Sequence, residues 1–81
     1  MGPSDLRRLL TTRPFQPFRI VMTDGTVYEV HHPDMVIVGR STAVVGYPDP
    51  SEPGVADHFD LVALLHITRV EFIGQPATPT A

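Results

Sequence analysis

The sequence predicts a mainly β domain in which a short N-terminal helix precedes a bent five-stranded small barrel. Three features indicate this fold class: leucines at helical spacing near the N-terminus, an Asp-Gly pair between two alternating apolar runs, and further short apolar runs in close succession. Short consecutive strands favour a barrel, because closure removes exposed sheet edges. The 81 residues suit one domain, which we expect over residues 1–73.

The helix is expected over residues 4–12. Ser4 is the candidate N-cap residue, because its hydroxyl suits the unpaired amides of a first turn. Pro14 disfavours a helical conformation at the residue before it and so ends the helix. One face carries three leucines at positions i, i+3 and i+4, which predicts packing on the rest of the domain. These leucines are Leu6, Leu9 and Leu10.

A hairpin follows, with Asp24 and Gly25 at its turn. An Asp-Gly pair between alternating apolar runs is a strong hairpin signal, but it allows two registers. A two-residue turn would place Ile20 opposite Glu29, an apolar side chain against a carboxylate. A three-residue loop, closed by Gly25 in a left-handed conformation, places Ile20 opposite Tyr28 instead.

The three-residue loop is favoured because it separates polar from apolar side chains. It pairs Arg19 with Glu29 on one face and gathers apolar side chains on the other, and a cross-strand pair of either kind contributes about 0.2–1 kcal/mol. A slip of one residue would reverse every face. The apolar face consists of Phe18, Ile20, Tyr28 and Val30.

The later strands are expected to be short. Pro33 lacks an amide hydrogen and therefore marks a bulge or bend after the hairpin. Met35–Val38 is apolar at both alternating positions, which predicts a fully buried strand. An exposed, proline-rich acidic loop is expected over residues 48–57. The remaining predicted strands are Ala43–Tyr47, Leu61–Leu65 and Arg69–Ile73, the last two separated by a break at His66–Thr68.

The C-terminal part leaves one alternative open, since Asp60–His66 could instead form one short helix. Beyond it, the Pro/Thr/Ala composition of residues 74–81 predicts a disordered tail.

Composition limits the classes of function. The absence of cysteine excludes disulfides, thiolate metal sites and a thiol nucleophile. The six basic residues are all arginine and the net charge is −3, whereas nucleic-acid-binding proteins usually carry a basic surface. The apolar runs are too short to span a bilayer and the N-terminus lacks a signal-sequence pattern, so we expect a cytoplasmic protein without membrane contact.

Histidines are the first candidates for a chemical site. His31 and His32 are strand neighbours that point to opposite faces, so they need the bend at Pro33 to approach one ion together. A metal site would also need His58 or His66 to converge on them, together with a carboxylate such as Asp34. We expect neither a metal nor a cofactor, with one histidine exposed and the other hydrogen-bonded locally.

No other pattern predicts catalysis. Ser41 and Thr42 follow Arg40 in a turn, where hydroxyls commonly bond the backbone, and no spacing supplies a histidine and a carboxylate to activate them. The acidic residues of the proline-rich segment are expected to be solvated; they are Asp49, Glu52, Asp57 and Asp60. We therefore expect no enzyme and assign no catalytic, cofactor-binding or metal-binding residue.

Aromatic side chains could stack on nucleic-acid bases if arginines surrounded them. The candidates are Phe15, Phe18 and Tyr28, with Arg13, Arg19 and Arg40 as nearby cations. Core packing between the helix and the barrel is the expectation for these aromatics.

Two segments carry a resemblance to a known family. The first, LRRLLTTRPFQPFRIVMTDGTVYEV, has a leucine helix, a proline, a strand, a glycine turn and an aromatic second strand, and the second, LLHITRVEFI, has apolar positions at matching places. The sequence resembles Sm-like (Lsm) domains, which implies a bent Sm-like or SH3-like small barrel. The family residues that grip a nucleotide have no counterpart at Gly39–Thr42 or at His66-Ile67. The core PFxPFxIxxxDGxxxxVxHP more closely resembles small uncharacterised bacterial proteins, which implies no activity.

These observations favour a non-catalytic module that associates with itself. Residues 58–73 hold two apolar strands with little charge, and an unpaired edge of that kind requires cover. The resemblance implies that such strands pair with a neighbouring subunit, so a homo-oligomer through residues 58–73 is expected. The alternative by fold analogy is an RNA-binding module, which the net charge opposes; for an enzyme or small-ligand binder no constellation is visible.

Overall fold

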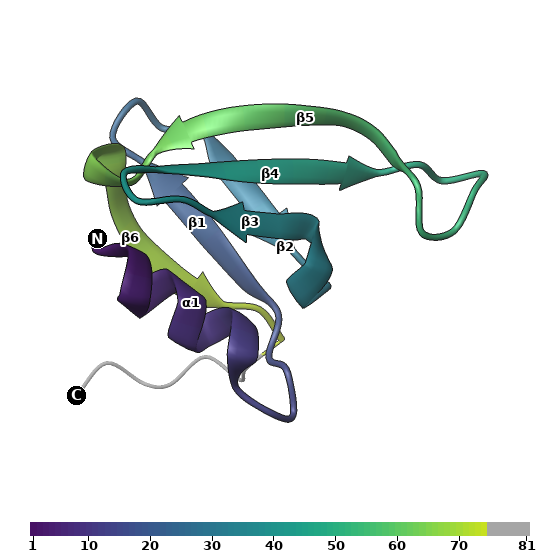
Figure 1. The fold of residues 1–81 in the computed structure, drawn as a ribbon, viewed down its shortest axis with the longest axis horizontal. Helices are drawn as coiled ribbons and strands as arrows, with labels where there is room; N and C mark the ends of the chain where they lie inside the picture. The colour runs from purple at the N-terminus through teal and green to yellow at the C-terminus, as the bar shows by residue number, and fades with distance from the viewer. Residues whose placement is uncertain (75–81) are drawn as a thin grey trace.

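The computed structural model describes residues 1–74, which form one α-helix, six strands and two 3₁₀ turns. The strands lie in two three-stranded antiparallel sheets, ordered β2-β1-β6 and β3-β4-β5 (Figure 1). The elements are α1 Pro3–Thr11, β1 Phe18–Met22, β2 Val27–Val30, η1 Pro33–Met35, β3 Val36–Val38, β4 Thr42–Pro48, β5 Ala56–Ala63, η2 Leu64–His66 and β6 Ile67–Phe72. The mainly β class with one short N-terminal helix is confirmed.

The expected count of five strands is wrong. Pro33 begins the 3₁₀ turn η1, which separates β2 from β3 and divides the strand that was expected to bend. A proline cannot donate to a ladder, so the pairing stops there. The result is two sheets that are not closed into one barrel.

Helix α1 begins earlier than predicted. Its N-cap residue is Gly2 and its first residue is Pro3, so Ser4 lies inside the first turn. The carboxylate of Asp5 accepts the Gly2 amide at 3.2 Å, which supplies the cap expected from a serine hydroxyl. Proline suits a first helical position because its missing amide hydrogen has no partner there anyway.

The predicted hairpin register is confirmed. Ile20 lies opposite Tyr28 and Arg19 opposite Glu29, with Arg19 Nε donating to the Glu29 carboxylate at 2.9 Å. Gly25 has φ 92°, the left-handed conformation that the three-residue loop requires. The loop closes with the Gly25 amide donating to the Met22 carbonyl at 3.0 Å.

The core lies between α1 and the two sheets. Leu6 and Leu10 are buried and Leu9 packs against the same cluster, so the predicted docking of the helix through its leucine stripe is confirmed. Phe15 also packs on the edge of this cluster. The largest fully buried side chains come from α1 and both sheets: Leu6, Phe18, Ile20, Val30 and Val45.

Three predictions about the second sheet and the turn that follows it are wrong. Strand β3 is not fully buried, since Ile37 is 65% exposed on the outer face of the sheet, where the described residues provide no covering layer. Strand β5 starts before Leu61 and ends at Ala63, because it pairs with β4 over the whole length of Ala56–Ala63. The break is the 3₁₀ turn η2, neither His66–Thr68 nor a helix over Asp60–His66.

Apart from Gly74, the predicted disordered tail lies outside the described residues. Among residues 1–74, α1 is too short to cross a membrane, and no other α-helix is present.

Candidate functional site

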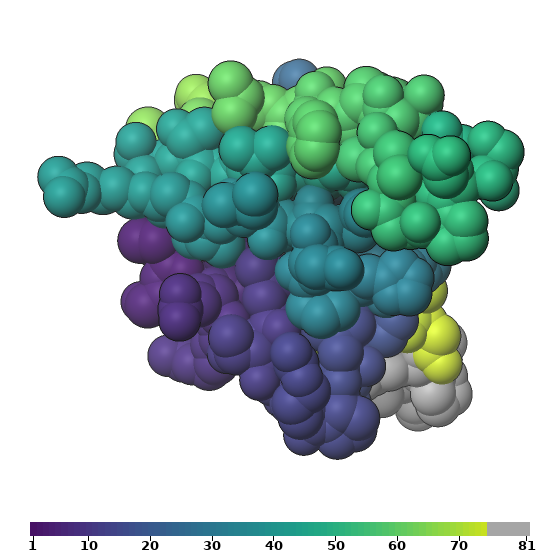
Figure 2. All heavy atoms as spheres, turned by 45° about the vertical axis from the view of Figure 1, so that its right-hand side comes forward, coloured from purple at the N-terminus to yellow at the C-terminus, as the bar shows by residue number. Residues whose placement is uncertain are grey.

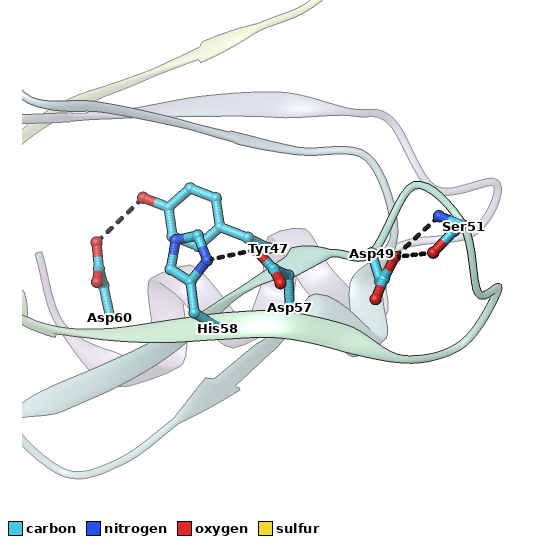
Figure 3. A network of polar contacts seen from close by, with 6 residues as sticks. All are labelled: Tyr47, Asp49, Ser51, Asp57, His58 and Asp60. Carbon is cyan, nitrogen blue, oxygen red and sulfur yellow. Dashed lines mark hydrogen bonds and ion pairs between the residues drawn. The ribbon is translucent and has the colours of Figure 1, made fainter.

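The main polar cluster joins three strands around one carboxylate. Asp60 on β5 accepts hydrogen bonds at Oδ2 from the hydroxyls of Tyr28 on β2, at 3.2 Å, and Tyr47 on β4, at 3.1 Å. Figure 3 shows Tyr47 directed at Asp60 along the β4–β5 ribbon. His58 and Asp60 are two residues apart, so they lie on the same side of β5. Tyr47 is the cross-strand partner of His58 and lies beside both.

Both tyrosines are held protonated. Burial and then the hydrogen bond to Asp60 raise the pKa of Tyr47 from 10.0 to about 12. The same two causes raise the pKa of Tyr28. A general base or nucleophile near neutral pH would need its pKa shifted the other way, so these hydroxyls act here as donors that tie β2 and β4 to β5.

A histidine extends the cluster along the ribbon. The imidazole of His58 stacks on the ring of Tyr47, with centroids 4.1 Å apart and planes at 17°. Its Nδ1 lies 3.1 Å from the carboxylate of Asp57, a pair in which both side chains are more than half exposed. The stack leaves the imidazole in solvent and gives the ribbon an aromatic inner surface.

The histidines considered as metal ligands do not converge. His31 lies 3.2 Å from the carboxylate of Glu29, and His58 belongs to the Tyr47 stack. His32 precedes η1 and His66 ends η2, at different places in the fold. Within residues 1–74, no three His, Asp or Glu side chains, Asp34 included, are grouped so as to hold a metal ion.

The remaining candidates have structural surroundings. Ser41 lies in the β3–β4 turn, where its carbonyl accepts the Leu64 amide at 2.9 Å, and Thr42 begins β4. Phe15 and Phe18 contact one another at 5.9 Å between ring centroids in the core region. Tyr28 is buried, so these three aromatics form no exposed stacking platform.

The acidic residues of the proline-rich segment separate into two environments. Asp60 belongs to the tyrosine cluster, whereas Asp49, Glu52 and Asp57 lie in or beside the β4–β5 loop. Asp49 accepts the Ser51 amide at 2.8 Å and its hydroxyl at 2.7 Å (Figure 3). These bonds lower the pKa of Asp49, so its carboxylate is ionised at neutral pH.

The surface formed by residues 1–74 includes two hollows near the candidate residues. One of about 440 Å³ lies between α1 and β3 and has two arginines, Arg7 and Arg13, beside an apolar floor. The other, of about 350 Å³, lies between the β1–β2 turn and the end of β5, beside Asp24 and His66. Neither contains the Asp60 cluster as a whole.

The outer face of the second sheet is apolar. Phe59 and Leu61 on β5 are 60% and 74% exposed, and Leu65 in η2 is 83% exposed. In the ladder, Leu61 lies opposite Val44, which lies opposite Ile37, so the apolar row crosses all three strands. Sequence reasoning placed these residues in strands but did not show that they face outward.

Comparison with protein-family models, with curated proteins and with solved structures finds no match for this chain.

The raised tyrosine pKa predicts a loss of stability in alkali. The folded pKa of Tyr47, about 12, exceeds its ordinary value of 10.0, so the stabilisation is complete below pH 10 and is lost as the pH rises toward 12. Urea unfolding at neutral pH and at about pH 11 measures this slope. Tyr47→Phe should reduce the slope; an unchanged slope in that variant would show that Tyr47 is not its source.

Proposed function

We propose that this protein is a non-catalytic interaction module that associates with copies of itself through residues 58–73. The observation that carries the proposal is the exposure of three apolar side chains at an edge strand. Phe59 and Leu61 lie on the edge strand β5, and Leu65 lies in the turn directly after it. An antiparallel sheet normally has one solvated polar face. Here the solvated face of β5 is apolar, and burial of such a face against a partner protein is more favourable than its exposure to water.

The sheet edges support the same proposal. Among the described residues, β5 pairs with β4 on one side only and β6 pairs with β1 on one side only. Unpaired backbone groups on such an edge form a template for another strand. If β5 of one copy pairs with β6 of the next, each copy uses both edges, and the contact closes into a ring when the rotation permits it.

The Sm-like resemblance belongs to this proposal. If β2 and β3 are treated as one strand bent at Pro33, the strand count becomes five and the edges become β6 and β5. The resemblance implies subunit pairing at the equivalent edges. The protonated tyrosines around Asp60 also suit a structural role for the polar cluster.

Light scattering at micromolar concentration tests the proposal, with Leu61→Lys as the variant. Lysine on an exposed edge strand opposes pairing with a second strand, so we expect the wild type to exceed the mass of one chain and the variant to approach it. Val27→Lys is the matched control, because Val27 is also an exposed apolar strand residue but lies on β2. A wild type with the mass of one chain, unchanged on dilution, would overturn the proposal.

RNA binding is the second candidate, favoured by the arginines on and near α1. Arg7, Arg8, Arg13 and Arg40 have no ion-pair partner within residues 1–74, whereas Arg19 and Arg69 are paired with glutamates. The net charge of −3 opposes tight binding at physiological salt. A sub-micromolar Kd for a short single-stranded RNA that weakens with salt would replace the first candidate by this one.

A further inference from the structure

Four arginines and the acidic residues of the β4–β5 loop lie in different parts of the fold, although Asp5 on α1 and Asp34 in η1 place two carboxylates near the arginines. The arginines without an ion-pair partner among the described residues lie on α1, just after it and in the β3–β4 turn; they are Arg7, Arg8, Arg13 and Arg40. Three carboxylates lie in or beside the β4–β5 loop; they are Asp49, Glu52 and Asp57. This loop projects from the body at one end of the 42 Å long axis, away from α1 (Figure 1).

The positive end has a groove with an apolar floor. It measures about 440 Å³ and lies between α1 and β3, with Leu10 and Val36 buried beneath it and Ile37 exposed at its rim. Arg13 is held at this groove, since its Nη1 donates to the Leu10 carbonyl at 3.0 Å and to the Thr12 carbonyl at 3.1 Å. Arg7 also lines the groove and lies on α1 one helical turn before Leu10.

Charge on the groove is net positive. Asp34 is its one acidic lining residue, against the two guanidinium groups of Arg7 and Arg13. A guanidinium binds a carboxylate through paired hydrogen bonds better than an ammonium does. The groove therefore suits a segment that presents carboxylates together with an apolar side chain.

The β4–β5 loop has this chemistry and is pre-organised. The Asp49 amide donates to the Val55 carbonyl at 2.8 Å, which closes the base of the loop. Glu52 and Asp57 are exposed, and between them Val55 is an exposed apolar side chain. A loop whose shape is set before binding loses less conformational entropy when it binds.

We propose that the groove between α1 and β3 binds the acidic β4–β5 loop of a second copy. Arg7 and Arg13 pair with the loop carboxylates, and Val55 contacts the apolar rim at Ile37. The loop projects from the body away from α1, which forms one wall of the groove (Figure 1), and Figure 2 shows α1 in purple on one side of the molecule and the loop in green on the other. The contact is therefore between copies, and it is heterologous, joining two different surfaces.

This contact goes beyond the pairing of β5 and β6 edges because it uses different residues and a different force. Edge pairing buries apolar side chains and persists in salt. Exposed ion pairs are screened, and the Debye length falls from about 10 Å at 0.1 M to about 3 Å at 1 M ionic strength. Association that remains in Leu61→Lys and disappears at about 1 M salt would belong to the groove.

Charge reversal with mixing tests the proposal on the full chain. The groove variant is Arg7→Glu with Arg13→Glu, and the loop variant is Glu52→Arg with Asp57→Arg. Each variant alone opposes like charges, so its self-association at low salt should weaken roughly tenfold. An equimolar mixture should recover association, because the reversed groove then meets the reversed loop while the native groove meets the native loop.

Arg8→Glu is the matched control, because Arg8 also lies on α1 but does not line the groove. It should associate as the wild type does. Sedimentation of tagged and untagged copies measures each combination, and thermal unfolding shows that each variant is folded. No gain on mixing would overturn the proposal, as would an equal loss in Arg8→Glu. A wild type that does not self-associate at low salt but binds a single-stranded RNA, which the groove variant fails to bind, would assign the groove to nucleic acid and also overturn it.

Discussion

Replacing Leu6 by alanine should lower the free energy of unfolding by about 2–5 kcal/mol, as removal of a fully buried leucine does. Leu6 is 0% exposed and packs in the cluster shared by α1 and both sheets. The substitution removes apolar contacts and leaves a cavity beneath a helix of only nine residues. A helix of that length depends on packing for its stability, so the packing of α1 against the sheets should weaken.

Urea unfolding measures the loss as a shift in midpoint at unchanged slope. Leu9→Ala is the control, because it makes the same change in helix propensity at a position that is only partly buried. It should cost clearly less than Leu6→Ala. Equal losses for the two variants would mean that helix propensity, and not docking of the leucine stripe, determines the result.

Replacing Gly39 by alanine should cost on the order of 1–3 kcal/mol, the range found for overpacked sites. A Cβ at Gly39 would lie 2.8 Å from the backbone carbonyl oxygen of Thr42, and the Gly39 amide donates to that same oxygen at 2.7 Å. The turn between β3 and β4 cannot keep this hydrogen bond and accept a methyl group. Its opening would weaken the short strand β3.

Gly46→Ala provides the comparison for this turn. A Cβ at Gly46 would lie 3.1 Å from the ring of Phe59, and that ring is 60% exposed and free to move. We expect a much smaller loss of stability than for Gly39→Ala in the same thermal or urea unfolding measurement. Equal stability of Gly39→Ala and the wild type would contradict the backbone clash.

Local patterns predicted the parts of the fold that local forces determine. The leucine stripe of α1 and the β1–β2 register follow from spacing within a few residues of each other, so both were predicted correctly. The strand count was predicted wrongly, because Pro33 was expected only to bend a strand, whereas the 3₁₀ turn η1 interrupts the pairing there. The helix start was missed because the Asp5 carboxylate binds the Gly2 amide and replaces a serine cap.

The parts that depend on distant partners could not be predicted. The length of β5 follows from its pairing with β4. The acidic and aromatic residues at the start of β5 do not by themselves indicate a strand. The exposure of Ile37 follows from what the other elements leave uncovered. The cluster around Asp60 requires the registers of three strands at once, although the period-two spacing of His58, Asp60 and Val62 is a signal that a strand there has one inward side.

The place of β1 in its sheet has a consequence for the order of folding. Strand β1 lies between β2, its neighbour in sequence, and β6, at the other end of the described chain, so that Ile20 pairs with both Tyr28 and Val70. The first pairing closes a short loop and forms quickly, whereas the second must wait until the chain between them is arranged, because distant contacts carry a larger loop-closure entropy. The hairpin is therefore expected to form first and β6 to complete the sheet last, which makes docking of that strand the step that sets the folding rate.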